Sequence, residues 1–309
     1  MRRLLLVALL ALVTAPAVHA GGEQAAVVAA AGRVWVTDGS RVLELDARSG
    51  RILRRVPVRY PFAIALALSD GNVWAESVED GFVSGAVTRI PFDARRGTSA
   101  LVPHRPVYEI ASDGRFVWLL VGPHARQRLV RIDVATGRAR TQRVAKRAGL
   151  LAADPTGRVR GLFATVGAQL FRYGEAGSAQ RLAWVGRAGR PAVGLGSVWL
   201  PHGDTVLRVD PASGRIEGRL RVAGAAWLSV TVGERSVFVL EWQARSLSLL
   251  RIDPVRLRVA ARVSLAGIDG AELAYGDGAL WLSTSTPTLT LWQIDPATLD
   301  RRQFASLPF

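Results

Sequence analysis

Three histidines are the side chains in this sequence best suited to acid–base chemistry. His104, His124 and His202 are the histidines that follow residue 20, and the chain contains no cysteine. An imidazole acts as a general base when a neighbouring carboxylate lies within hydrogen-bond reach and tunes it. His202 has two candidate partners, Asp204 and Glu241. No residue is assigned outright as catalytic, and these three form the catalytic set of an enzymatic alternative.

A metal site is not predicted from the same residues. A zinc site needs three or four converging ligands, and the three histidines are separated by long stretches of chain. Without cysteine there are no thiolate ligands and no disulfides. We therefore expect no cofactor, and a divalent ion enters only with the enzymatic alternative.

Basic and aromatic side chains form a second candidate site. The formal net charge is +15, and Lys146 is the only lysine among 40 basic residues, which indicates a general arginine bias. Clustered arginines focus a positive potential and attract anions, and an exposed tryptophan can stack on a sugar or another flat ring. The predicted ligand-binding residues are Arg59, Tyr60, His104, Arg105, His124, Lys146, Arg147, Arg187, His202 and Trp242.

A sequence pattern that is repeated seven times must form the elements that position these residues. Its first anchor is Gly-x-Val-Trp, as in Gly196-Ser-Val-Trp199, and it recurs about every 40 residues. Four-stranded propeller blades have a repeat of ~40–45 residues. The tryptophan position is filled in turn by Trp35, Trp74, Trp118, Arg160, Trp199, Phe238 and Trp281.

A second anchor follows each first one and ends in a turn. Val206-Leu-Arg-Val-Asp210 leads into Pro-Ala-Ser-Gly214, and most other copies read similarly. Aspartate accepts hydrogen bonds from turn amides, proline fixes the backbone angle, and glycine takes the left-handed position. One carboxylate per turn supplies too few oxygens for calcium, so we interpret these aspartates as turn caps.

The repeats predict an all-β protein, a seven-bladed β-propeller of four-stranded antiparallel blades. Small residues in each first strand suit the crowded axis, and arginine alternates along the fourth strands at the outer edge. We expect one domain over 21–309, closed by packing the first blade on the seventh without strand exchange. The predicted blades span 21–58, 59–103, 104–145, 146–187, 188–223, 224–267 and 268–309.

In such a ring, the loops between second and third strands share one face with the links between blades. All three histidines and the basic links fall on this channel-mouth face. The catalytic alternative and the ligand-binding residues therefore converge on one side of the molecule.

The repeated sequence pattern of the blades resembles that of the exported YVTN-type and streptogramin B lyase-like propellers of bacteria. The resemblance covers residues 21–309 and implies the same fold. Lyases of this kind tend to have the sequence Trp-Phe-Thr-Glu in the second strand, where this chain has Trp35-Val-Thr-Asp38 and Trp199-Leu-Pro. The resemblance thus implies an architecture, with a lyase or hydrolase using a histidine base as the alternative activity.

The first twenty residues have the layout of a secretory signal peptide. Two arginines precede a leucine-rich run, and small residues stand before an expected cut after Ala20. The apolar run is about half the ~20 residues that a bilayer span requires. We expect an exported monomer, periplasmic or secreted, without a membrane span.

The predicted function is a non-catalytic binding scaffold. Its expected partner is an anionic or carbohydrate-like ligand of the cell envelope, or a protein, bound at the channel-mouth face. Nucleic acid is not expected, because few aromatics accompany the basic residues and an exported protein would rarely meet it.

Overall fold

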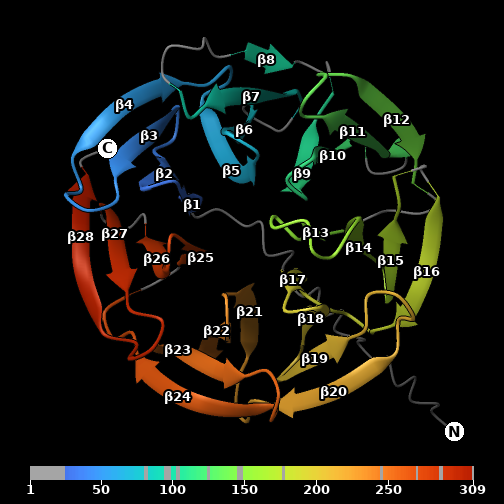
Figure 1. The fold of residues 1–309 in the computed structure, drawn as a ribbon, viewed down its shortest axis with the longest axis vertical. Coiled ribbons are helices and arrows are strands. Elements are labelled where there is room, and N and C mark those ends of the chain that lie inside the picture. Colours follow the sequence, from blue (N-terminus) through green and yellow to red (C-terminus); the bar gives the residue numbers. More distant parts are fainter. Residues whose placement is uncertain are drawn as a thin grey trace, which may run out of the picture.

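The computed structural model forms a ring of seven four-stranded sheets (Figure 1). It describes residues 25–79, 83–93, 99–101, 105–123, 126–144, 149–175, 178–243, 246–268, 271–284 and 288–307. Neighbouring strands within each sheet are antiparallel and follow one another along the chain. The seven-bladed propeller predicted from the repeats is confirmed. The expected signal peptide, residues 1–20, lies outside the described residues.

Each blade runs from an innermost strand near the axis to an outermost strand at the edge. Blade one comprises β1 (Val27–Ala30), β2 (Arg33–Thr37), β3 (Arg41–Asp46) and β4 (Ile52–Pro57). Blade two comprises β5 (Phe62–Ser69), β6 (Asn72–Val78), β7 (Gly85–Pro91) and β8 (Ser99–Leu101). Blade three comprises β9 (Val107–Ser112), β10 (Phe116–Val121), β11 (Arg128–Asp133) and β12 (Ala139–Arg143). Blade four comprises β13 (Leu151–Ala153), β14 (Leu162–Val166), β15 (Gln169–Tyr173) and β16 (Ala179–Trp184).

The remaining three blades repeat the same plan. Blade five comprises β17 (Ala192–Gly194), β18 (Ser197–His202), β19 (Thr205–Val209) and β20 (Ile216–Arg221). Blade six comprises β21 (Trp227–Val232), β22 (Val237–Gln243), β23 (Ser246–Asp253) and β24 (Arg258–Ser264). Blade seven comprises β25 (Glu272–Gly276), β26 (Ala279–Thr284), β27 (Leu289–Ile294) and β28 (Arg301–Leu307).

The hydrophobic core lies between the blades. Second strands such as β10 are buried along their whole length, because a neighbouring blade covers each face. The anchor tryptophan always faces the following blade: Trp199 packs with Val237 and Val239 of blade six. Outer strands such as β20 alternate half-buried and exposed positions, as a strand with one wet face should.

The sequence alignment of blade four was wrong. Arg160 was placed at the tryptophan position, but β14 begins only at Leu162. Phe163 is the fully buried residue that packs against Val198 and Leu200 of blade five, as the tryptophans do elsewhere. Residues 154–161 form a longer loop, and its first residue, Asp154, accepts hydrogen bonds from the Thr156 and Val159 amides at 2.9 Å each.

Arginines of the third strands join consecutive blades. Arg208 donates from Nη1 to the Pro254 carbonyl of blade six at 3.1 Å, and Arg251 reaches Pro296 of blade seven at 3.4 Å. The Arg208 guanidinium also lies 5.7 Å from the Trp199 ring centroid, within cation–π range. Hydrogen bonds from a charged donor contribute roughly 1.5–3 kcal/mol each. Part of the arginine excess therefore serves the fold.

The turns after the third strands are capped as predicted. Asp210 Oδ1 accepts from the Ser213 hydroxyl and from the Ser213 amide at 2.6 Å each, and these hydrogen bonds lower the pKa of Asp210. Asp133 and Asp295 make the equivalent bonds to Thr136 and Thr298.

The ring closes without strand exchange among the described residues. Sheets of blades one and seven each consist of four consecutive strands, and their side chains share one core cluster. The Gly32 amide donates to Asp277 Oδ2 at 2.7 Å, and the Ser283 hydroxyl donates to the Ala25 carbonyl. Within the part of the chain that the structure describes, no helix could cross a bilayer.

Candidate ligand-binding face

The channel-mouth face carries exposed arginines on three of the links between blades. Arg59, Arg105 and Arg187 are exposed, in the links that enter blades two, three and five. Among the described residues, none of the three has a carboxylate within ion-pair distance. Tyr60 is half-buried, and its amide donates to Ser77 Oγ at 3.3 Å. His104, His124, Lys146 and Arg147 lie outside the described residues.

The link into blade five is the best defined of these. The Val185 amide donates to the Ala168 carbonyl at 2.8 Å, and the Gly189 amide donates to Pro201 at 2.7 Å. A methyl group built on Gly186 would lie 2.5 Å from His202 Nε2, so the imidazole rests against this glycine. Gly186 also has a left-handed backbone, with φ of 64°, which favours glycine. The link is thereby fixed to both blades that it joins.

An ion pair crosses the ring beneath this face. Arg190, at the inner end of the same link, pairs with Glu109 of β9 in blade three through both terminal nitrogens, each at 2.9 Å. The Arg190 side chain keeps 46% of its surface accessible. Glu109 first, and then Glu272 and Glu76, raise the pKa of Arg190, so it is a permanent cation.

Glu76 lies behind this pair and is fully buried. Within the described part of the chain, neither of its carboxyl oxygens has a hydrogen-bond partner. Burial, followed by the charge of Glu109, raises the pKa of Glu76 from 4.5 to about 8. At neutral pH this carboxyl is therefore protonated, and the cluster of Glu76, Glu109, Arg190 and Glu272 carries a small net negative charge.

His202 is not joined to either of its predicted catalytic partners. Asp204 accepts from Arg221 Nε at 2.8 Å, which lowers the pKa of Asp204. Glu241 is buried and pairs with Arg262 at 3.0 Å. Among the described residues, no three histidine, aspartate or glutamate side chains are grouped as metal ligands.

The aromatic residue at this face differs from the predicted one. Trp242 was placed in an exposed loop, but it belongs to β22 and is half-buried against the core between blades six and seven. Trp184, at the end of β16, is instead 71% exposed. The sequence signal for Trp184 is its position at the end of a fourth strand, outside the Gly-x-Val-Trp anchor.

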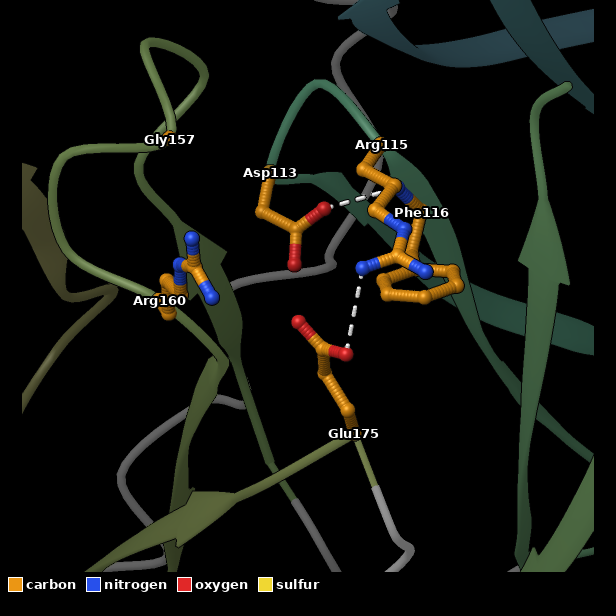
Figure 2. A pocket seen from close by; sticks show the side chains of 6 residues that line it. All are labelled: Asp113, Arg115, Phe116, Gly157, Arg160 and Glu175. Carbon is orange, nitrogen blue, oxygen red and sulfur yellow. Dashed lines mark hydrogen bonds and ion pairs between the residues drawn. The ribbon is translucent and has the colours of Figure 1, made fainter.

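The opposite face carries a cleft between blades three and four (Figure 2). Its volume is about 180 Å³, and the loop of residues 154–161 forms one wall. Arg115 pairs with Glu175 at 3.2 Å, and burial raises the pKa of Asp113. The charges of its two arginines and two acidic residues balance, so the cleft lacks the positive excess of the channel-mouth face. The lining residues are Asp113, Arg115, Phe116, Gly157, Arg160 and Glu175.

Comparisons with known proteins support the architecture. No protein-family model matches the sequence, and no curated protein matches it either. The WD40 repeats of RRP9 have a TM-score of 0.66 at 13% identity, covering 85% of this chain and 88% of that chain. The dihydro-heme d1 dehydrogenase NirN in complex with DHE has a TM-score of 0.58 at 15% identity, covering 90% and 73%. A chain of the Nidogen/Laminin complex has a TM-score of 0.53 at 12% identity, covering 74% and 92%.

Identities this low show the fold alone. They support the seven-bladed propeller, whereas the resemblance to YVTN-type and streptogramin B lyase-like proteins stays a prediction.

Proposed function

We propose that this chain is an exported scaffold that binds an anionic, carbohydrate-like ligand on its channel-mouth face without catalysis. One observation carries the proposal. Arg59, Arg105 and Arg187 are exposed on three links of one face, and no carboxylate of the described residues neutralises them. Signal-peptide features in Met1–Ala20 support export, and with it contact with envelope glycans.

The charge arrangement favours an anion at the rim and hydroxyl groups nearer the axis. An unpaired guanidinium offers two parallel donors that match a carboxylate or sulfate. Arg190 is already neutralised by Glu109, so the axis offers little attraction to a further anion. Its accessible guanidinium edge and the neighbouring carboxylates can instead exchange hydrogen bonds with sugar hydroxyls.

Salt-dependent binding tests the proposal. We expect the mature chain, residues 21–309, to bind oligogalacturonate with an affinity that falls as ionic strength rises. Replacing Arg59, Arg105 and Arg187 together by alanine should reduce the affinity at least tenfold and flatten the salt dependence. The matched control replaces Arg140, Arg181 and Arg219, three exposed arginines of outer strands, and removes the same charge. Equal losses in both triple variants would reduce the effect to net charge and contradict the proposal.

The enzymatic alternative has a separate test. A lyase or hydrolase using His202 would turn over a cyclic ester, with or without a divalent ion, and would lose turnover in His202→Ala. The commitment of Asp204 to Arg221 and of Glu241 to Arg262 leaves His202 without the tuning carboxylate that such chemistry uses. This arrangement favours the scaffold.

A further inference from the structure

We infer that Trp184 is a stacking platform for a pyranose ring, at the outer end of a binding track that follows residues 184–190. The inference rests on the proposed function and names the part of the ligand that the arginines do not explain: an uncharged, ring-shaped apolar surface.

The exposure of Trp184 is unusual in this protein. Trp35, Trp118, Trp199 and Trp281 are completely buried between blades, whereas Trp184 leaves 71% of its surface accessible. Tryptophan is enriched at interfaces, because its ring offers a large apolar surface and its N–H a hydrogen-bond donor. Tryptophan also loses little conformational entropy on binding, because only two side-chain torsions are fixed.

The backbone beside Trp184 is held in place before any ligand arrives. Trp184 is the last residue of β16, and the next amide, that of Val185, bonds to Ala168. His202 rests on Gly186, and the Gly189 amide bonds to Pro201. A fixed platform spares the ordering cost that a mobile loop would add to binding.

The link arranges three kinds of chemistry in order. It leads from β16, at the outer edge of the ring, to β17, near the axis (Figure 1). Trp184 stands at its outer end, the exposed Arg187 follows three residues later, and Arg190 with its partner Glu109 lies at the inner end. An elongated ligand along this track would meet an apolar ring, then a free cation, then a mixed set of donors and acceptors.

This order selects an acidic oligosaccharide over other anions. A pyranose presents an apolar face of C–H groups to an aromatic ring, a carboxylate to an arginine, and hydroxyls to both donors and acceptors. Polyphosphate carries the charge without the ring, so it could use Arg187 and would gain nothing from Trp184.

The test separates ring stacking from charge by comparing oligogalacturonate with polyphosphate. We expect Trp184→Ala to weaken oligogalacturonate binding about tenfold at both low and high salt, and Trp184→Phe to restore most of it. Polyphosphate binding should be unchanged in both variants. Bound oligogalacturonate should also shield wild-type tryptophan fluorescence from acrylamide, and this shielding should vanish in Trp184→Ala. The control is Val255→Ala, which removes another exposed apolar side chain from a turn on the opposite face.

The other outcomes overturn the inference in distinguishable ways. If Trp184→Ala binds oligogalacturonate within twofold of wild type while the triple arginine variant does not bind, the inference fails and the proposed function stands. If Trp184→Ala weakens both polymers equally, Trp184 supports the fold of the link and not a sugar ring. If the wild-type protein binds neither polymer, the proposed function fails first.

Discussion

Two buried glutamates, Glu44 between blades one and two and Glu76 in the second strand of blade two, show how differently the ring treats the same side chain. Glu44 occupies the place of the joining arginine in β3, and it accepts from Arg33 and from Arg54 Nε at 2.5 Å. These arginines in turn donate to the carbonyls of Phe92 and Pro91, at 2.7 and 2.8 Å, and so join blade one to blade two. Glu76 is equally buried, and neither of its carboxyl oxygens has a hydrogen-bond partner among the residues that the structure describes.

The difference lies in what compensates the carboxylate. A buried charge persists when opposite charges and hydrogen bonds replace its lost hydration, and otherwise the group takes up a proton. Glu44 has two guanidinium partners, whereas Glu76 faces Glu109, whose nearest cation is already engaged. The junction of blades one and two therefore holds a charged carboxylate, whereas β6 holds a carboxyl group that keeps its proton.

The largest expected effect is the pH dependence that Glu76 imposes on stability. The pKa of the Glu76 carboxyl rises from its ordinary value of 4.5 to about 8 in the folded protein, so the folded state binds this proton more tightly than the unfolded state does. The free energy of unfolding should therefore fall as the pH rises from about 4.5 to about 8 and then level off, by up to roughly 5 kcal/mol. Glu76→Gln should remove this decline, and urea unfolding at pH 5, 7 and 9 would measure it.

The control for this series is Glu79→Gln, which replaces an exposed glutamate of the same blade. It should follow the wild-type profile. A decline that persists unchanged in Glu76→Gln would mean that another group causes it.

The same substitution at Glu44 should act in the opposite direction. Glu44→Gln removes the charge that holds Arg33 and Arg54 and leaves two guanidinium groups against a neutral amide. Because both arginines are partly exposed and can regain water, we expect a loss of about 3 kcal/mol at pH 7. Urea unfolding would check it, and a variant as stable as wild type would show that the network adds nothing to the blade junction.

A smaller effect is expected from Arg190→Gln. Its cation lowers the pKa of Glu76, so its removal should move the stability decline to higher pH. Glu109 also loses its bidentate partner, and this loss should lower the free energy of unfolding by about 1 kcal/mol. The shifted profile is the informative readout, because a purely structural role for Arg190 would lower stability equally at every pH.

The fold was predictable from the sequence because each blade repeats the same local instructions. The anchor Val-Trp pair, the aspartate-capped turns and the small first strands point to the same four-stranded unit. Blade four was misaligned because Gly157-Arg-Val imitates the anchor, while the real strand begins after the loop that Asp154 caps.

The site was only partly predictable, since it depends on contacts between distant repeats. Arg190 and Glu109 are 81 positions apart, and no local pattern announces their pairing. Glu272 and Glu109 interrupt inner strands that are otherwise small and apolar, which was the one available signal. Trp242 was expected to be exposed and is half-buried in β22, because the position of a loop boundary decides whether an aromatic faces the core or the solvent.

The seam between blades one and seven has a consequence for the history and engineering of the chain. Six seams of the described ring are crossed by a covalent link, and the seventh is held by side-chain packing and a few hydrogen bonds. Among the described strands none is shared across this seam, so no blade is structurally first. The ends could be joined by one more link from the outer edge to the axis, and the chain could be reopened at another seam. Duplication of a single blade would extend such a ring without rebuilding any sheet.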